Sequence, residues 1–404
     1  MSISPRVAID DAQALPLPQR SGSMERGGAG VRRWAINGDF VTLRSTGVAR
    51  YAREVTRALD ALVAAQHPLV RGVELTLICP KPPAEAFDHL ALKVVPEFQR
   101  PRLPQAWVQL QLPRHVRGGL VSFCNLAPVA VRHQIVCIHD LQTRLAPESY
   151  GRLFRLAHRL ILPALGRRAA GITTVSNMSR DQLIRFGVAP AEKIRVTYNG
   201  SDHALRWRAE RTVFDFAPKR PFVLCLGRTE AHKNLDLLLR LAAPLDALGV
   251  DLAMAGDVGP EILQRIDGAG NIRLLGRIED DVFAAALSQA LCFLLPSRME
   301  GFGLPAVEAM ARGCPVIASS APCLPEVCAH AALYADPDDT GAWIAAVARL
   351  MSSPGLRRDL IAAGHTRARA FTWRGIALIY LSLMAELDGL SQGADQPEFQ
   401  AVQP

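Results

Sequence analysis

The chain has 404 residues, of which 49% are apolar and 21% are charged, and its 46 Lys and Arg against 38 Asp and Glu give a net charge of +8. This length favours two or three domains of ordinary size, and the near-average composition excludes disordered, collagen-like and low-complexity chains. The longest uncharged apolar runs, such as 221–227 and 291–297, are far shorter than the roughly 20 residues that span a membrane. The first 33 residues lack the apolar stretch of a secretory signal, so we expect a cytoplasmic protein.

The charge is unevenly distributed along the chain. Residues 1–206 contain 28 Lys and Arg against 15 Asp and Glu, whereas residues 207–404 contain 18 against 23. The excess is concentrated in 100–168, which has 11 basic and 2 acidic residues. A basic surface can attract nucleic acid, phosphate-bearing ligands or an anionic membrane. Aromatic residues are only 6%, and no nucleic-acid-binding motif is present, so the sequence disfavours nucleic acid as a partner.

The eight cysteines have no C-x-x-C spacing, and most lie inside apolar runs. This pattern is typical of buried, reduced thiols. A zinc site or a disulfide framework is the weaker alternative.

The first half of the chain alternates short apolar runs with helical patterns. After a flexible tail over 1–33, a strand is predicted at 33–38, a helix at about 48–66 and a strand at 73–79, where Pro80 ends the alternation. Further short apolar runs follow at 92–95, 119–123, 134–138, 171–175 and 194–198. This alternation predicts a parallel sheet with helices on both faces.

The same pattern restarts at 221–227. The later strands are predicted at 250–255, 271–275, 291–296 and 315–318, and the helices at 234–248, 260–267, 281–289, 305–312, 340–351 and 355–388. We therefore predict an α/β protein of two doubly wound domains, over 34–206 and 207–375, with a closing helix and tail over 376–404. A ligand is expected in the cleft between them, at the carboxyl ends of the strands.

Two candidate phosphate motifs differ in quality. The run Gly27-Gly28-Ala29-Gly30 precedes the first strand, whereas a dinucleotide fingerprint follows one, and no P-loop motif is present. After the strand that ends at Gly227 come Arg228 and Lys233, and then Asn234, a good N-cap, before an apolar helix. Two cations beside a helix N-terminus suit a diphosphate. The alternative is a pair of solvated surface cations.

A second motif runs from Glu300 to Glu308. Its glycines allow close approach of the backbone to a ligand, and Pro305 fits the first turn of a helix. We expect Glu308 in that first turn, facing the same edge of the cleft as Glu300. Carboxylates accept hydrogen bonds from vicinal hydroxyl groups, so the pair suits a sugar and a ribose. A general acid and base, or partners of the helix dipole, remain alternatives.

Taken together, these motifs resemble those of the retaining GT-B glycosyltransferases of family 4. The matching segments are Glu300-x7-Glu308, Gly227-Arg228 with Lys233-Asn234, Met254–Asp257, Leu275–Arg277, Thr174–Ser176, Tyr198–Gly200, Thr46–Tyr51 and His139-Asp140. The resemblance covers about 34–375. It implies two Rossmann-like domains, with the acceptor on the first and the nucleotide sugar on the second.

The resemblance also implies roles for individual residues around the donor's diphosphate and sugar. Arg228 and Lys233 would bind the diphosphate and neutralise the leaving group. Glu300 would accept hydrogen bonds from the sugar hydroxyls. Backbone amides would hold sugar and phosphate at three positions: Phe302, Gly303 and Leu304.

Other implied roles lie around this centre. Glu308 would bind the ribose hydroxyls, and Gly47 would let the first loop pass close to the phosphates. His139 would lie at the face of the sugar, with a satisfied core histidine as the alternative. Arg277 and Ile278 would meet the base, mostly through backbone.

The implied reaction is a metal-independent hexosyl transfer with retention, without a cofactor beyond the nucleotide sugar. GDP-mannose is the first expectation for the donor, because the likeness is to bacterial mannosyltransferases, and UDP-glucose, UDP-galactose and UDP-N-acetylglucosamine are alternatives. Asp336-Pro337-Asp338 is formally an Asp-x-Asp, but it precedes a helix and is interpreted as its cap. An inactive scaffold of the same fold and a nucleic-acid binder are the alternatives of another class.

The segment 151–168 has five arginines, a histidine and no acid. It is typical of an amphipathic helix lying in a membrane interface, or equally of a helix packed on the sheet with a basic outer face. The first hypothesis places the N-terminal domain on the inner face of the cytoplasmic membrane. The acceptor would there be a glycan, linked to a polyprenyl diphosphate, in surface or exopolysaccharide biosynthesis.

Overall fold

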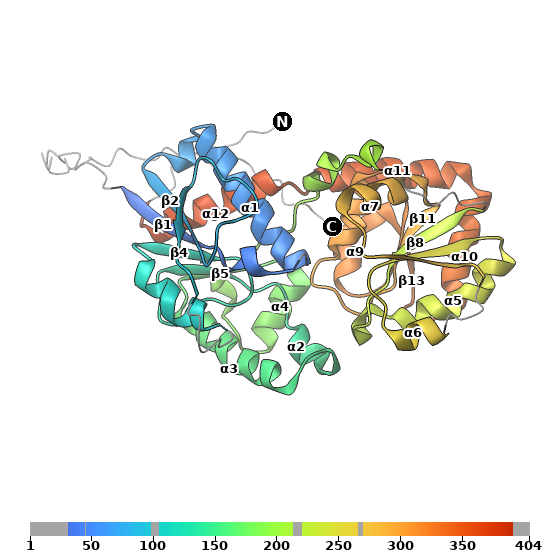
Figure 1. Ribbon diagram of the computed structural model, residues 1–404, viewed down its shortest axis with the longest axis horizontal. Coiled ribbons are helices and arrows are strands. Elements are labelled where there is room, and N and C mark those ends of the chain that lie inside the picture. The colour runs from blue at the N-terminus through green and yellow to red at the C-terminus, as the bar shows by residue number, and fades with distance from the viewer. Residues whose placement is uncertain (1–30, 45, 98–104, 213–219, 266–269, 391–404) are drawn as a thin grey trace, which may run out of the picture.

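The computed structural model describes residues 31–44, 46–97, 105–212, 220–265 and 270–390. The predicted tail over 1–33 lies outside them except for its last three positions, and so does 391–404. The described chain forms two lobes, each built on its own sheet (Figure 1).

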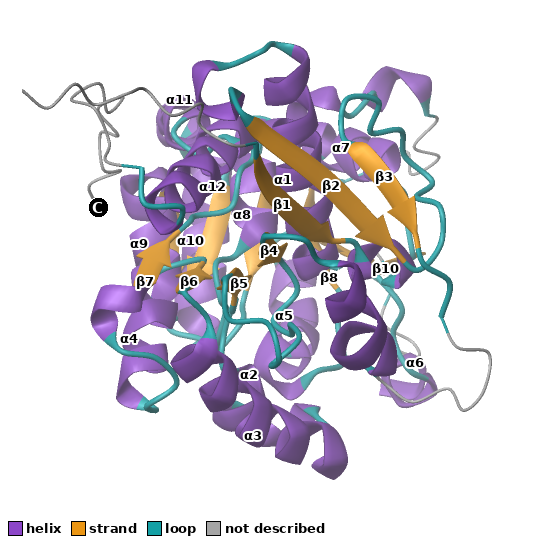
Figure 2. Cartoon of the chain, turned by 90° about the vertical axis from the view of Figure 1, so that its left-hand side faces the viewer, coloured by secondary structure: helices purple, strands orange, loops and turns teal. Residues whose placement is uncertain are grey.

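The first sheet has seven parallel strands in the order β3-β2-β1-β4-β5-β6-β7. The strands are β1 (Arg32–Asn37), β2 (Val73–Cys79), β3 (Ala91–Val94), β4 (Gly119–Ser122), β5 (Gln134–Cys137), β6 (Gly171–Thr174) and β7 (Ile194–Val196). The helices that connect them are α1 (Gly47–Ala64), α2 (Gln142–Leu145), α3 (Arg152–Arg168) and α4 (Asn177–Arg185). The strand order reverses beside β1, which is where ligands bind in doubly wound sheets. Figure 2 looks at this lobe, with β1, β2 and β3 in front and α3 at the bottom.

The second sheet has six parallel strands in the order β10-β9-β8-β11-β12-β13. The strands are β8 (Phe222–Leu226), β9 (Asp251–Ala255), β10 (Ile272–Gly276), β11 (Cys292–Leu295), β12 (Val316–Ser319) and β13 (Ala332–Ala335). The helices are α5 (Leu235–Ala247), α6 (Pro260–Arg265), α7 (Asp280–Gln289), α8 (Leu304–Ala311), α9 (Cys323–Cys328), α10 (Thr340–Ser352) and α11 (Pro354–Arg369). This is the strand order of a dinucleotide-binding Rossmann fold, so the predicted α/β class with two doubly wound domains is confirmed.

The last helix, α12 (Trp373–Leu387), returns to the first lobe (Figure 1). The Thr372 hydroxyl caps it by accepting a hydrogen bond from the Gly375 amide. The Tyr380 hydroxyl lies 2.7 Å from Thr173 Oγ1 in β6 and 3.0 Å from the Tyr51 hydroxyl in α1. Because α12 is bonded to the first domain, the chain returns from the second lobe to the first through 370–372.

One helical stretch, Pro354–Leu387, is apolar and long enough by length and composition to pass for a membrane span. It consists of α11 and α12, and half of its most apolar window is buried inside the protein. Trp373 and Tyr380 are fully buried among core side chains. The stretch therefore has the character of two core helices. All eight cysteines are free and buried, as predicted.

Candidate functional site

Lys233 and Glu300, predicted to face one donor, form an ion pair. Lys233 lies in the loop after β8 and Glu300 in the loop after β11, and these strands are neighbours in the sheet. Lys233 Nζ lies 2.8 Å from Glu300 Oε1, which also accepts a 2.7 Å hydrogen bond from the Ser297 hydroxyl. The Lys233 side chain stays 25% exposed, whereas that of Glu300 is 9% exposed. The pair thus presents a cation at the edge of the cleft.

The loop between β8 and α5 differs from its prediction at Asn234. This residue has a left-handed backbone, with φ of 59°, and its side chain does not cap α5. Its Nδ2 instead donates to the carbonyl oxygens of Pro296 and Pro337, at 3.1 Å and 2.7 Å. Asn234 therefore occupies the predicted N-cap position, but its side chain makes no capping hydrogen bond and is instead held by two carbonyl groups of neighbouring loops. Arg228, earlier in this loop, is 47% exposed and 4.0 Å from Glu230.

The loop that follows Glu300 touches the first domain. The Ser176 hydroxyl donates a 2.7 Å hydrogen bond to the Gly301 carbonyl oxygen. A Cβ atom on Gly301 would lie 3.2 Å from Asp140 Oδ2 and 3.3 Å from the His139 carbonyl oxygen. The carboxyl ends of β5 and β11 therefore face each other across a narrow gap.

The side chains of Phe302 and Leu304 are buried, at 3% and 6% exposure. Phe302 packs against Tyr198 and Phe371. Gly303 has φ of +89° and precedes α8. The side chains of Phe302 and Leu304 are thus part of the core, and the ligand contacts predicted for the backbone amides of this segment stay a prediction.

Glu308 lies in the second turn of α8, not in the first as predicted, because the helix starts at Leu304. It is 6% exposed. Its Oε1 lies 2.8 Å from His203 Nε2 and 3.7 Å from Arg50 Nε. Arg50, on α1 of the first domain, also makes two hydrogen bonds with Asp280, the first residue of α7. Burial opposes the charge on Arg50, but Asp280 and Glu308 outweigh it and raise the pKa of the guanidinium.

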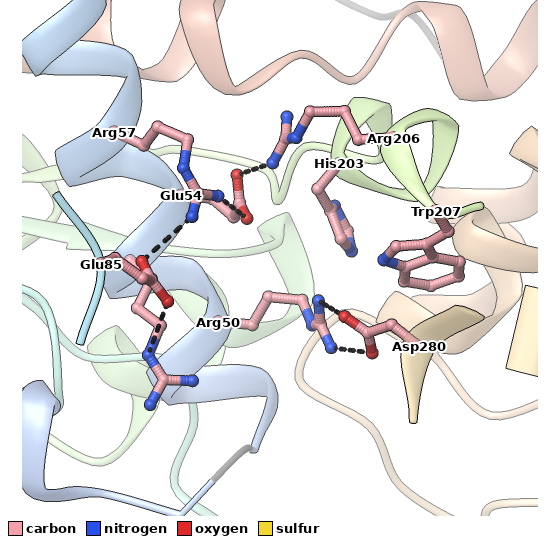
Figure 3. A pocket seen from close by; sticks show the side chains of 9 residues that line it. Arg50, Glu54, Arg57, Glu85, His203, Arg206, Trp207 and Asp280 are labelled. Carbon is pink, nitrogen blue, oxygen red and sulfur yellow. Dashed lines mark hydrogen bonds and ion pairs between the residues drawn. The ribbon is translucent and has the colours of Figure 1, made fainter. Parts of the chain in front are cut away.

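Three of these residues, Arg50, His203 and Asp280, border a cavity of about 210 Å³ between the two domains (Figure 3). It is lined by Arg50, Arg53, Glu54, Arg57, Glu85, His203, Arg206, Trp207 and Asp280. Glu54 accepts hydrogen bonds from Arg57 and Arg206. The sequence motifs imply no role for Arg50, His203 or Asp280. Arg50 lies inside the matching segment Thr46–Tyr51, but no motif of the sequence includes His203 or Asp280.

His139 is 4% exposed and directed into the first domain. Its Nε2 lies 2.7 Å from the Phe123 carbonyl oxygen, and its ring packs edge-on against Tyr51. Burial lowers the pKa of His139, but Cys137, the Phe123 carbonyl group and the charge of Asp140 together outweigh it, so the pKa is raised. In this conformation the ring is buried in the core with its Nε2 hydrogen-bonded, which is the alternative given for His139 in the sequence analysis. A contact of His139 with the donor sugar stays a prediction.

Gly47, Arg277 and Ile278 lie at the margins of the site. Gly47 opens α1, and a Cβ atom there would meet nothing within 4 Å. Arg277 is exposed and Ile278 half-buried, in the turn between β10 and α7. Their predicted contacts with phosphate and base are not tested by this geometry.

Across the cleft from Lys233, the first domain contributes Ser149 and Tyr150. The Ser149 hydroxyl lies 3.2 Å from His232 Nδ1. Burial, followed by the charges of Asp140, Glu230 and Glu300, raises the pKa of Tyr150. Burial, followed by Lys233, lowers the pKa of His232. The residue next to Lys233, His232, is therefore in contact with the first domain.

The segment Asp336-Pro337-Asp338 does not cap α10 as predicted. Asp339 does so, because its Oδ1 accepts from the Ala342 amide. Asp338 instead forms an ion pair with Arg298. In the described ranges, no cluster of three or more His, Cys, Asp or Glu side chains could hold a metal ion.

Two Rossmann-like domains with these loops at their facing edges define a GT-B glycosyltransferase. Residues 208–367 match the family described as Glycosyl transferases group 1, and residues 45–205 match Glycosyltransferase Family 4. The chain belongs to this family of glycosyltransferases, as the motifs predicted.

Two bacterial relatives match about two thirds of this chain. O-antigen chain mannosyltransferase B of Escherichia coli is 30% identical over 67% of this chain and 74% of that protein. O-antigen chain mannosyltransferase RfbU of Salmonella typhimurium is 26% identical over 69% of this chain and 82% of that protein.

Solved structures share the fold. Sucrose-phosphate synthase from Thermosynechococcus elongatus superposes with a TM-score of 0.68 at 20% identity, over 89% of this chain and 100% of that one. HepE from Anabaena, in complex with UDP and glucose, superposes with a TM-score of 0.64 at 17% identity, over 88% of this chain and 99% of that one.

Proposed function

We propose that this glycosyltransferase moves mannose from GDP-mannose to a glycan acceptor, with retention of configuration and without a metal ion, in the synthesis of a surface polysaccharide. The observation that carries the proposal is the Lys233–Glu300 pair, because it brings a cation next to the carboxylate that we propose binds the sugar. Mannose is supported by the relatives, two of which are named O-antigen chain mannosyltransferases. A UDP-sugar is the second candidate, supported by HepE in complex with UDP and glucose.

The proposed chemistry follows from charge. Breaking the sugar–phosphate bond builds positive charge on the anomeric carbon and negative charge on the diphosphate. A fixed cation at Lys233, together with the half-exposed Arg228 in the same loop, stabilises that separation more than it stabilises the ground state. Glu300 holds both the Lys233 ammonium and, in the proposal, the hydroxyls of the transferred sugar.

A donor screen tests this proposal. Thermal shift and donor hydrolysis are measured without added metal and with EDTA, using GDP-mannose, UDP-glucose, UDP-galactose and UDP-N-acetylglucosamine. We expect a shift with GDP-mannose that Lys233→Ala abolishes and that the exposed-site control Lys93→Ala keeps. A shift with a UDP-sugar alone would replace the donor, and activity only after metal is restored would refute metal independence.

We further propose that helix α3 docks the enzyme on the cytoplasmic face of an anionic membrane, where a lipid-linked acceptor presents its sugar. The second half of α3 packs on the first sheet through Leu162 and Leu165. Its first half leaves large apolar side chains in solvent: Leu153 is 84%, Leu160 65%, Leu156 55% and Phe154 48% exposed. Exposed arginines lie between them, at Arg152, Arg155 and Arg159. Apolar insertion and attraction to anionic headgroups would act together here.

Liposome flotation tests the docking. Wild-type protein is expected to float with vesicles of phosphatidylglycerol and phosphatidylcholine, less so at high salt, and not with phosphatidylcholine alone. The triple variant Leu153→Asn, Leu156→Asn, Leu160→Asn should stay in the dense fraction, while Leu92→Asn, an exposed leucine on β3, should float. Equal flotation of the triple variant would refute α3 as the docking surface.

A further inference from the structure

His203 connects the two domains at the edge of the site. It lies in a short 3-10 helix, Asp202–Arg206, in the segment that follows the first sheet, and it is 1% exposed. Its Nε2 lies 2.8 Å from Glu308 Oε1, and its Nδ1 lies 3.0 Å from Trp373 Nε1. One imidazole therefore joins α8 of the second domain to α12, which packs on the first.

The partners of the ring assign its tautomer. An indole N–H is a donor only, so Nδ1 of His203 must accept from Trp373. The proton of the neutral ring then resides on Nε2, which faces the Glu308 carboxylate and donates to it. By donating to Nδ1, Trp373 keeps the proton of His203 on Nε2, where it is directed at Glu308.

Both neighbours of Glu308 contact the same oxygen. His203 and Arg50 approach Oε1, so Oε2 is the acceptor that the hydroxyl groups of a ligand would use. A carboxylate as buried as this one is stabilised only when it is hydrogen-bonded. The bond from His203 meets that need and limits rotation of the carboxylate about its last side-chain bond.

We propose that His203 is a positioning residue for Glu308, holding that carboxylate in the orientation that accepts hydrogen bonds from the ribose hydroxyls of the nucleoside diphosphate. The inference rests on the proposed function, and it takes the role of Glu308 from the family resemblance of the Glu300-x7-Glu308 segment. It adds that ribose recognition depends on the segment between the domains and, through Trp373, on the closing helix.

Two substitutions separate the two bonds of His203. In His203→Gln, the side-chain amide nitrogen can take the place of Nε2 and donate to Glu308. In His203→Asn, the shorter side chain can still accept from Trp373 but does not reach Glu308. The pair therefore compares loss of the bond to Glu308 with its conservation in the same polar environment.

The readout is the ratio of Kd values for 2′,3′-dideoxy-GDP and GDP, measured by calorimetry, with the UDP pair run in parallel. This ratio reports the ribose hydroxyls, and a merely structural role of His203 would leave it unchanged. We expect His203→Asn to reduce the ratio about tenfold, in line with loss of a hydrogen bond to a charged group. His203→Gln should stay within about threefold of wild type, as expected where the hydrogen bond is kept.

Glu308→Gln serves as the reference that separates two failures. If Glu308→Gln leaves the ratio unchanged, Glu308 does not bind ribose and the role that the family resemblance implies for it is wrong. If Glu308→Gln reduces the ratio but His203→Asn does not, the positioning role is overturned while the proposed function stands.

A second measurement does not depend on whether His203→Asn folds. In wild-type protein labelled with ¹⁵N-histidine, the His203 signals, assigned by their loss in His203→Gln, should show a proton on Nε2 and none on Nδ1. The opposite tautomer would overturn the assignment on which the proposal depends.

Discussion

Arg50 and Asp280 join the two domains through a pair of parallel hydrogen bonds, Nη1 to Oδ2 at 2.9 Å and Nη2 to Oδ1 at 2.6 Å. The same guanidinium lies 3.7 Å from Glu308 through Nε. Arg50 therefore faces two carboxylates of the second domain. Its two hydrogen bonds with Asp280 hold the guanidinium away from a close contact with Glu308, the carboxylate proposed to bind ribose.

The first prediction concerns Asp280→Asn. Loss of this carboxylate leaves Arg50 to pair with Glu308, where it competes with the ribose hydroxyls. We expect the donor KM to rise about three- to tenfold while kcat changes little. Because the Asp280 side chain is 47% exposed, the free energy of unfolding should fall by only about 0.5–1 kcal/mol.

The neighbouring exposed acid offers a control for that change. Glu279→Gln removes the same charge one residue earlier and should leave KM and stability unchanged. Steady-state kinetics and denaturant unfolding measure both. An equal rise of KM in the two variants would mean that net charge, and not the Arg50–Asp280 pair, matters.

The second prediction is that substitutions of Lys233 and of Glu300 have different effects on the affinity for GDP. Lys233→Met removes the cation for the diphosphate and should weaken GDP binding about 10- to 100-fold, the range for hydrogen bonds to charged groups. Glu300→Gln releases Lys233 from its partner, so GDP binding should be unchanged or tighter, while kcat/KM for transfer falls about 100-fold. Calorimetry with GDP and a transfer assay give the two quantities, and parallel losses of GDP affinity would contradict these roles.

Much of this arrangement could be predicted from the sequence, because strands alternate with helices and adjacent parallel strands end at the same edge. Lys233 and Glu300 are predictable neighbours, since each follows one of two adjacent strands. The role of His203 is not predictable, because its partners Glu308 and Trp373 are remote in sequence. The Arg50–Asp280 contact is not predictable either, because it depends on how the domains pack.

Other misses have local causes. Asn234 has the composition of a helix cap, but two carbonyl groups from other loops bind its amide. His139 lies two residues after β5, close to the predicted strand end, and the direction of its ring is set by the Phe123 carbonyl group. The strand Ala332–Ala335 was not predicted, because four residues with partial exposure give little periodic signal.

The third prediction compares two glycines of one loop. Gly303→Ala places a side chain at φ of +89° and brings a Cβ atom to 2.5 Å from Leu324 Cδ2. The free energy of unfolding should fall by about 1–3 kcal/mol. Gly301→Ala meets Asp140 and the His139 carbonyl at 3.2–3.3 Å, so it should leave stability nearly unchanged but hinder approach of the domains and lower kcat. Thermal unfolding and kinetics of both variants test this, and the reverse order of stabilities would contradict it.

The last prediction concerns pH and Asp39, which follows β1. Burial raises the pKa of this carboxyl from 3.8 to about 7, against a smaller lowering by the Phe40 amide. The folded chain therefore keeps a proton that the unfolded chain releases between these two values, and stability falls as pH rises through this window. The contribution is fully present below about pH 4 and is lost as pH passes 7.

Asp39→Asn keeps the shape and stays neutral at every pH. The variant and wild type should have equal free energies of unfolding near pH 4, and the variant should be more stable by about 1–2 kcal/mol at pH 8, a figure reduced because the residue is partly exposed to solvent. Denaturant unfolding of both proteins at pH 4, 6 and 8 measures the difference. A difference that stays constant from pH 4 to pH 8 would show that Asp39 ionises normally in the folded protein. Its environment would then be more hydrated than its buried Oδ1 indicates, which has no hydrogen-bond partner among the residues that the structure describes.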